Sequence, residues 1–355
     1  MTTSLLEEVP PERRTPVPGV REALDRRQAT SPPPTYAVVR WAGATIFAAI
    51  LVALVVTLVG GSRQALAHSG LRFLWSGTWD TAHNVYGAGI FVVGTALTTA
   101  VALALAVPIG LAGAAFLAEI APARLAAPLS VAIDLIAAVP SVVVGLWGLL
   151  VLSPIFASDV EPFLAKLPVA GAVFQGQDLG ASMLLAGVVL AVMILPTVVS
   201  LSRTALAGVP VADREAAMAL GATRWQVIRR AVIPGAHSGI EAGVTLATGR
   251  AMGETIAVAM VIGNHFALPR SLGSALFSPG ATLGSAVINT FGEATAGIQR
   301  SEVIALVVYL LAISIAVNAG GQFLLRRRRA LRAPRRAPGS GRAPERAPGS
   351  GRATP

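Results

Sequence analysis

Cysteine is absent from this chain of 355 residues, and lysine occurs once, as Lys166. Without cysteine there is no disulfide framework, no thiolate nucleophile and no zinc site built on sulfur. A nucleotide-binding P-loop needs Gly-Lys-Ser/Thr after a glycine-rich turn, and the FLAKLP sequence around Lys166 does not have that form. The sequence therefore predicts that this chain has no ATP site of its own.

Histidine is also scarce, and the four residues lack the spacing of metal ligands. None of them lies at the middle of an apolar run, where an intramembrane hydrolase would need a base beside its nucleophile. We therefore expect no metal site, no catalytic residue and no cofactor bound by this chain. The four histidines are His68, His83, His237 and His265.

Charged residues make up only 13% of the chain, whereas hydrophobic residues make up 54%. Soluble domains carry about 25% charged residues, so this composition predicts a multi-pass membrane protein. Six apolar runs are long enough to cross a bilayer as helices, and we expect an all-α fold of six transmembrane helices. The runs are 38–61, 88–117, 129–153, 181–202, 236–264 and 302–325.

The basic residues predict the orientation of these helices. Of the 28 Arg and Lys residues, 22 lie on the side that holds both termini and the segment 203–235, and five lie on the other side. The positive-inside rule then places both termini and that segment on the cytoplasmic side of the membrane. We expect this membrane to be a bacterial plasma membrane.

Three regions follow from composition. Residues 1–37 are rich in Pro, Arg and Glu and predict a disordered cytoplasmic arm, and 38–325 form the transmembrane domain. Residues 326–355 begin with four arginines and repeat APGSGRA, which predicts a basic low-complexity tail in the cytoplasm. The sequence Ala65-Leu66-Ala67 resembles a signal-peptidase site, but the apolar run before it exceeds a usual signal core, which favours a retained span.

The polar stretch DREAAMALGATRWQVIRRAVIP, residues 213–234, lies between two apolar runs and predicts helix, turn, helix. Asp213 can cap the first helix, Gly221 can end it in the left-handed conformation, and Pro234 can close the second helix. Thr223 and Gln226 form a capping box for that second helix. A DNA-binding motif is excluded because abutting membrane spans leave no access to a major groove. A docking site for another protein explains the stretch better.

Acidic and basic residues inside apolar runs are candidates for a transport path, because buried charge in a membrane is costly. Arg250 and Glu254 are four residues apart in the run 236–264 and would share one helix face. They form either a self-neutralising structural pair or an anion contact with a compensating acid. Asp134 either pairs within the bundle or lines the path. The glycines of the same run, spaced by four, fit either a permease–permease interface or packing within one subunit.

Two levels of resemblance follow from these motifs. Glu215, Ala216 and Ala217, followed by Gly221 and Pro234, resemble the EAA loop of ABC importer permeases, which docks on the cytoplasmic ATPase. Five stretches, of which one contains this EAA loop, resemble the C-type permease subunit of the high-affinity phosphate ABC importer. They are VPSVVVGLWG (139–148), MILPTVVSLSR (193–203), EAAMALGATRWQVIRRAVIP (215–234), GRAMGETIAVAMVIGN (249–264) and FSPGATLGSAVINTFGEA (277–294). Asp134 departs from the expected glutamate.

The resemblance implies an assembly of two permeases, two ATP-binding subunits and an extracytoplasmic phosphate-binding protein. ATP and Mg²⁺ would be used by the partner ATPase. Phosphate selectivity would reside chiefly in the binding protein, while the path would need a few anion-compatible groups. Arg250 is the first candidate, and Thr248 and Thr255 would add hydroxyl donors.

Two other functions remain open at this stage. An importer of another oxyanion, such as sulfate or molybdate, would carry the same EAA loop. A stand-alone secondary transporter would need inverted repeats and coupling-ion acids, and would leave the EAA loop unexplained.

Overall fold

The computed structural model describes residues 34–166, 180–267, 272–294 and 297–332, and these residues form helices joined by short loops. The chain divides into two compact units, Met1–Thr57 and Leu58–Pro355. In the first unit the described residues belong to helix α2 (Pro34–Gly61), whose apolar side chains are exposed along its length. Such a helix needs an apolar environment, as a bilayer provides. The helix begins inside the arm that the sequence assigned to residues 1–37.

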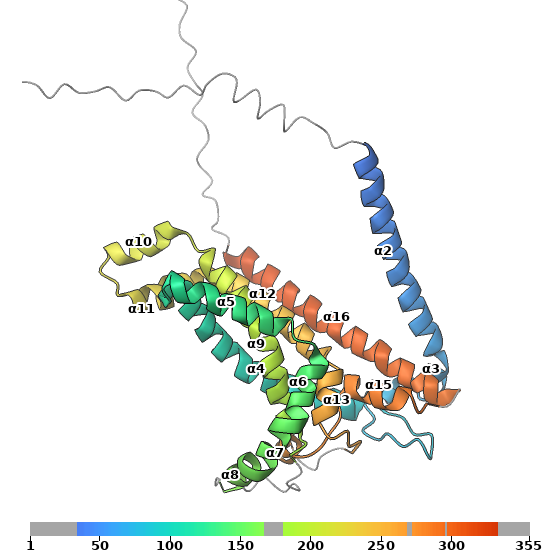
Figure 1. The fold of residues 1–355 in the computed structure, drawn as a ribbon. Coiled ribbons are helices and arrows are strands. Elements are labelled where there is room, and N and C mark those ends of the chain that lie inside the picture. The colour runs from blue at the N-terminus through green and yellow to red at the C-terminus, as the bar shows by residue number, and fades with distance from the viewer. Residues whose placement is uncertain (1–33, 167–179, 268–271, 295–296, 333–355) are drawn as a thin grey trace, which may run out of the picture. The chain divides into compact units, whose positions relative to one another are not determined.

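The second unit consists of long helices connected by short ones (Figure 1). Three π-helical turns, η3, η4 and η5, join consecutive α-helices into continuous helical rods. The α-helices are α3 (Arg63–His68), α4 (Gly89–Ala115), α5 (Ala123–Ala137), α6 (Ser141–Trp147), α7 (Ser153–Ile155), α8 (Glu161–Ala165), α9 (Met183–Ala207), α10 (Val211–Ala219), α11 (Arg224–Val227), α12 (Ile233–Met252), α13 (Ile256–Val261), α14 (Leu272–Phe277), α15 (Leu283–Phe291) and α16 (Ile298–Arg332).

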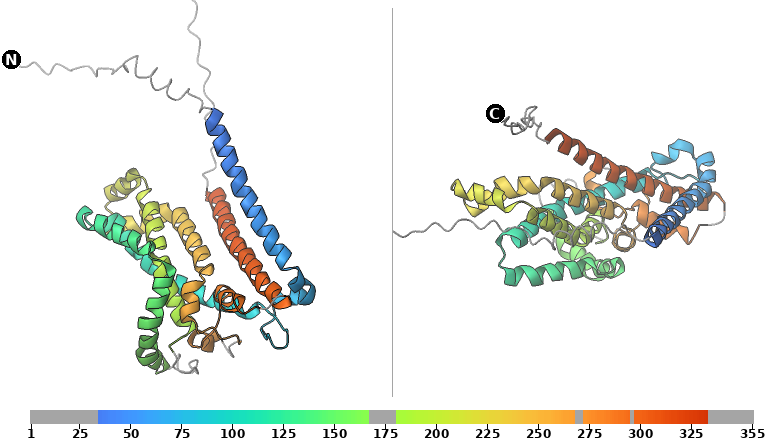
Figure 2. Two further views of the ribbon diagram at one scale, coloured as in Figure 1. Left: turned by 45° about the vertical axis from the view of Figure 1, so that its right-hand side comes forward. Right: turned by 90° about the horizontal axis from the view of Figure 1, so that it is seen from above.

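Helix α9 is the centre of this unit, with α4 packed along one side and α12 along another (Figures 1 and 2). More than half of its residues are buried, which fits a sequence that is apolar on all sides from Met183 to Pro196. Ser182 caps its start by accepting a hydrogen bond from the backbone N–H of Leu185 at 3.2 Å. Helix α16 packs along α12. The apolar core therefore runs along α9 and ends beside α10 and α11.

Five helices in the described part of the chain are long and apolar enough to cross a membrane. They are Thr35–His68, Gly89–Ile120, Ser141–Leu164, Met183–Ala207 and Ile298–Phe323. The prediction of an all-α, multi-helix membrane protein is thus confirmed, whereas the fifth predicted run, 236–264, is not one continuous helix.

Two predicted spans were wrong in their boundaries. The run 129–153 is broken at Pro140, which lies in an extended conformation between α5 and α6. Proline lacks a backbone N–H and disfavours helical geometry in the residue before it, so an apolar run through Pro140 does not form one helix. The run 236–264 ends its first helix at Met252. Helix α16 continues to Arg332, six residues past the predicted start of the tail at 326.

A polar hairpin precedes α4, at the end of the unit opposite α10 (Figure 1). Asp80 and Val85 exchange backbone hydrogen bonds of 2.8 and 2.9 Å, and Asn84 takes a left-handed φ of 51° in the turn. The Asp80 carboxylate accepts a hydrogen bond from His83 Nδ1 at 2.6 Å. This contact raises the pKa of His83 above 6.5 and lowers that of Asp80.

We expect NMR titration of histidine-labelled protein to show the His83 imidazole titrating above the ordinary value of about 6.5. The raised pKa means that the pair stabilises the hairpin below pH ~6.5 and that this contribution is lost as the pH rises through the folded-state pKa. Asp80→Asn should return the His83 pKa toward its ordinary value. An unchanged titration in that variant would contradict the pairing, and His83→Gln assigns the signal.

Candidate functional site: the coupling segment and the break after α12

The segment 203–235, which contains the predicted docking stretch, is called the coupling segment. Its first helix, α10, starts immediately after Pro210, and three residues separate it from the end of α9. Pro210 is its N-cap residue, and no side chain caps the helix. The prediction that Asp213 caps it was therefore wrong. Asp213 lies inside the first turn, where a negative charge is favourable beside the free backbone N–H groups.

The turn between α10 and α11 has the predicted chemistry. Gly221 has φ +81°, and the backbone N–H groups of Gly221 and Ala222 bond back to Met218 O and Ala217 O at 2.9 and 3.2 Å. These two bonds define a Schellman motif, which satisfies the last carbonyls of α10. The capping box of Thr223 and Gln226 is also present. The sequence pattern therefore predicted this helix-turn-helix correctly.

Pro234 does not close the second helix, contrary to the prediction. Helical backbone continues from α11 through the π-helical turn Ile228–Val232 into α12, and Pro234 lies in the first turn of α12. A proline within a helix removes one hydrogen bond and crowds a carbonyl of the preceding turn, and a wider π-helical turn accommodates both effects. The second docking helix is consequently continuous with a helix of the core.

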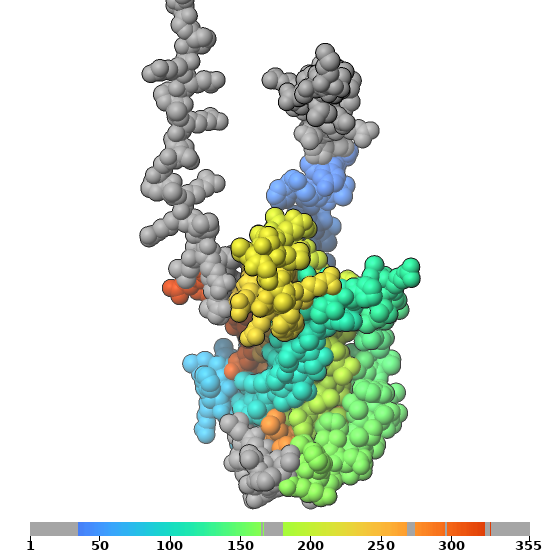
Figure 3. Space-filling view, turned by 90° about the vertical axis from the view of Figure 1, so that its left-hand side faces the viewer, coloured from blue at the N-terminus to red at the C-terminus, as the bar shows by residue number. Residues whose placement is uncertain are grey.

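The outer surface of the coupling segment is more apolar than its sequence suggested. Glu215 and Ala216 are exposed, while Ala217 is half-buried against the core. The structure also exposes Leu220, at 90% of its surface, and Trp225, at 60%. Figure 3 shows this segment, in yellow, at the surface of the molecule. Exposed apolar side chains of this kind are common at sites where another protein binds.

Sequence reasoning missed Arg214, which makes the densest set of contacts in the segment. Its guanidinium donates to the carbonyls of Leu206 and Val209, at 2.8 and 2.6 Å, and to Glu119 Oε1 at 2.9 Å. Glu119 lies in the π-helical turn Phe116–Ile120 (η2) that ends α4. The opposite charges were visible in the sequence, but 95 residues separate them. No local pattern could have paired them.

Arg250 and Glu254 do not share one helix face, so the predicted geometry of this pair was wrong. Helix α12 ends at Met252, Gly253 is its C-cap, and α13 begins at Ile256. The Glu254 carboxylate accepts a hydrogen bond from the backbone N–H of Ala257 at 3.2 Å and so caps α13. Within the described residues no ion pair joins Glu254 to Arg250. The self-neutralising pair is absent from this arrangement.

The Arg250 side chain is exposed and donates to Thr197 Oγ1 of α9 at 3.2 Å. Helix α12 ends at Met252, two residues after Arg250, so this cation lies close to the end of one helix and the start of the next. Non-helical backbone at membrane depth occurs where it is buried in protein or lines a water-filled path. This combination suits the transient binding of an anion.

The other three predicted pathway residues occupy different environments. Thr248 donates its hydroxyl to Val244 O of its own helix at 2.8 Å, and Thr255 lies in the break itself as the N-cap residue of α13. Asp134 is exposed on α5, before the break at Pro140, and is not inside a span. The structure thus brings Arg250, Glu254 and Thr255 to one break, and Asp134 lies on a separate helix.

The regularly spaced glycines of α12 pack within this chain. A Cβ atom added at Gly239 would lie 2.6 Å from Ala205 Cβ of α9, and one at Gly243 would lie 2.9 Å from Leu201 Cβ. Gly249 is in direct contact with Asn318 of α16. Of the two interpretations left open by the sequence, the structure therefore favours close packing inside one subunit for these three positions.

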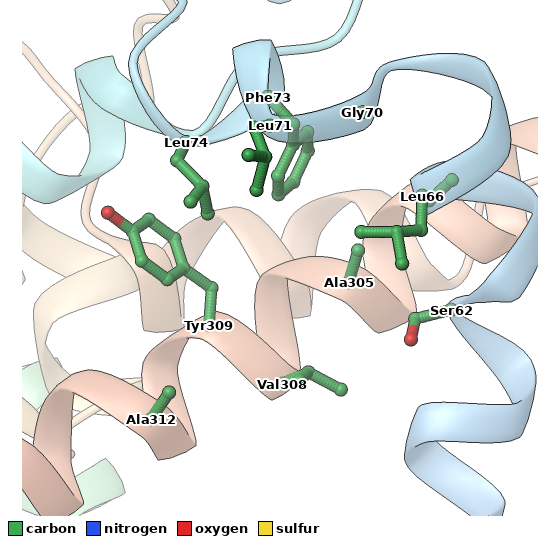
Figure 4. A pocket seen from close by; sticks show the side chains of 11 residues that line it. Ser62, Leu66, Gly70, Leu71, Phe73, Leu74, Ala305, Val308, Tyr309 and Ala312 are labelled. Atoms are coloured by element: carbon green, nitrogen blue, oxygen red, sulfur yellow. The ribbon is translucent and has the colours of Figure 1, made fainter.

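One cavity, of ≈ 330 Å³, lies between α3 with the 3₁₀ turn Gly70–Leu74 and α16 (Figure 4). Its lining is almost entirely apolar, with Leu66, Leu71 and Phe73 facing Val308 and Ala312. An apolar lining offers no compensation for a dehydrated anion, so this cavity does not suit phosphate.

Comparison with known proteins agrees with this architecture. Residues 106–330 match the family model of the binding-protein-dependent transport system inner membrane component. The chain belongs to this family. The matched permease region begins inside α4 and contains the coupling segment and the break after α12.

Individual relatives of this permease carry more specific names. It is 40% identical over 287 residues to the phosphate transport system permease protein PstC of Pasteurella multocida, covering 79% of this chain and 88% of that protein. It is 38% identical over 331 residues to PstC of Xylella fastidiosa, covering 92% and 98%. A solved bacterial alginate ABC transporter, in complex with a pentasaccharide-bound periplasmic protein, aligns with a TM-score of 0.48 at 15% identity over 80% of this chain and 94% of that one. The resemblance to C-type phosphate permeases is thus confirmed.

Proposed function

We propose that this chain is the permease subunit of an ABC importer that moves inorganic phosphate across the bacterial plasma membrane. The observation that supports phosphate as the substrate is the 40% identity to a phosphate transport system permease over 88% of that protein's length. The apolar helices and the family support a multi-pass membrane protein. Import of sulfate or molybdate by the same kind of transporter is the alternative, whereas stand-alone secondary transport does not agree with the family.

The driving force would come from a separate ATPase subunit that docks on residues 213–234. The two short helices, the Schellman turn between them and the exposed Leu220 and Trp225 support this assignment. ATP and Mg²⁺ would be bound by that partner. A second, homologous permease, a second ATPase subunit and an extracytoplasmic phosphate-binding protein would complete the assembly.

The substrate would pass beside the break after α12. Arg250 would meet the anion there, while the Glu254 carboxylate would keep the local net charge low and prevent tight binding. A transit site must bind weakly enough to release its ion, so a compensated arginine is suited to this role. Thr255 would line the break, and Thr248 and Asp134 would lie along the approach.

Uptake of labelled phosphate at low external concentration tests this function in cells that lack the gene and in cells that regain it. Other phosphate uptake systems are deleted in both strains, and labelled sulfate is measured in parallel. We expect phosphate uptake to be lost and restored with the gene, while sulfate uptake stays constant. Unchanged phosphate uptake, or a loss of sulfate uptake, would overturn the substrate assignment and leave the family membership intact.

A further inference from the structure

Three structural elements meet at the Arg214 side chain. Arg214 belongs to the first turn of α10, and Leu206 lies in the last turn of α9, with Val209 in the linker after it. Glu119 lies in the last turn of the rod formed by α4 and η2. Helices α9 and α10 are joined by a short linker, but α4 is not connected to the coupling segment through the local sequence. The Arg214–Glu119 ion pair is therefore a direct bond between the docking helix and α4.

The contact is sheltered from water. Only 18% of the Arg214 side chain and 12% of the Glu119 side chain are exposed, and Arg214 Nε is also buried. Salt screens such a pair much less than an exposed one. The guanidinium donates to the carbonyl of Leu206, in the last turn of α9, and to that of Val209, in the linker after it. The carboxyl end of a helix favours a cation. Removing one partner would leave the other buried and unpaired, so the three elements are held in one geometry.

The apolar packing around this contact supports the same connection. Ala114 and Leu117 of the α4 rod share a buried cluster with Leu206 and Val209 and with Val227 of α11. Figures 1 and 2 show the start of α5, which follows the α4 rod, at the same end of the unit as α10. A displacement of α10 is thus passed to the ends of α4 and α9 through the ion pair and the shared apolar cluster.

We propose that Arg214 and Glu119 are positioning residues that transmit movement of the docked ATPase from α10 to α4. This inference rests on the proposed docking function. Arg250 and Thr197 contact each other across α12 and α9, and α9 is the main packing partner of α4. Movement of the α4–α9 pair therefore reaches the break where the anion is proposed to pass.

The test uses the complete complex in proteoliposomes, with wild type, Arg214→Gln, Glu119→Gln and the double variant. Phosphate uptake, ATP hydrolysis and the amount of co-purified ATPase subunit are measured for each. We expect Arg214→Gln to lower uptake about tenfold relative to ATP hydrolysis, with the ATPase subunit still bound. Because the two residues act as one pair, adding Glu119→Gln to Arg214→Gln should cause no further loss.

Arg214→Lys is the conservative variant and should restore part of the uptake, since a lysine keeps the charge but cannot reach three acceptors with a planar fork. Arg124→Gln, on the exposed start of α5, is the matched control for the loss of one positive charge and should transport as wild type does. The chain has no native cysteine, so spin labels can be attached to it at Asp213→Cys and Ile120→Cys alone. The distance between the two labels reports how firmly α10 is held against the end of the α4 rod. Arg214→Gln should broaden that distance distribution.

Normal uptake per ATP in Arg214→Gln, or additive losses in the double variant, would overturn the proposal. Loss of the ATPase subunit from Arg214→Gln would also overturn it, because Arg214 would then belong to the docking surface. If the wild-type chain itself retains no ATPase subunit, the proposed docking function fails instead, and the two failures are thereby distinguished.

Discussion

Replacing Gly221 by valine is expected to lower phosphate uptake about tenfold or more while the transmembrane bundle stays folded. Gly221 has φ +81°, and a residue other than glycine pays about 1–2 kcal/mol in the left-handed region, with β-branched residues the least tolerant. Nothing lies within 4 Å of an added Cβ, so the effect comes from the backbone alone. The strain falls on the Schellman motif that fixes the orientation of α10 relative to α11. If the fraction of molecules with this orientation falls, the apparent affinity for the ATPase falls by the same factor.

Gly221→Asn is the matched control for this variant. Asparagine adds a side chain into the same open space but tolerates the left-handed region, so most of the uptake should remain. Aspartate shares part of that tolerance, and Gly221→Asp would therefore test added negative charge beside Leu220 more than backbone strain. Uptake, ATP hydrolysis and membrane level are measured for each variant. Equal uptake in the valine and asparagine variants would contradict the requirement for this turn.

Arg250→Ala is expected to abolish high-affinity phosphate uptake without removing the protein from the membrane. The side chain is exposed, bonds only to Thr197 within the described structure, and leaves no buried carboxylate unpaired when it is removed. Loss of one hydrogen-bonded charge from an anion site costs about 2 kcal/mol or more, which is roughly a thirtyfold loss of affinity. The measurement is phosphate uptake normalised to the amount of permease in the membrane.

Thr197→Val is the control that separates the two contacts of Arg250. It removes the hydroxyl that accepts from Arg250 but keeps the cation, so uptake should change far less than in Arg250→Ala. Arg250→Lys keeps the charge and should retain part of the activity. A fall in membrane level for Arg250→Ala equal to the fall in uptake would assign Arg250 to folding and remove it from the path.

The sequence predicted the coupling segment well because its signals are local. A positive-φ glycine and a Thr–Gln capping box act within a few residues, so Gly221, Thr223 and Gln226 could be assigned from the pattern alone. Pro234 was misassigned because a proline ends a helix in most settings. A π-helical turn before it lets the helix continue, and the buried Val232 of that turn lies in the same apolar cluster as Leu206 of α9.

Composition and charge by themselves determined that this is an all-α membrane protein, and local motifs determined the family. Tertiary structure alone decided which charged residues meet. Arg250 and Glu254 are separated because the helix breaks between them, and Glu254 bonds to the backbone N–H of Ala257 at the new helix start. Arg214 and Glu119 are joined because two helix ends, 95 residues apart, pack on one apolar cluster. Helical periodicity reaches about four residues along the chain, whereas long-range contacts follow from burial of whole helix faces.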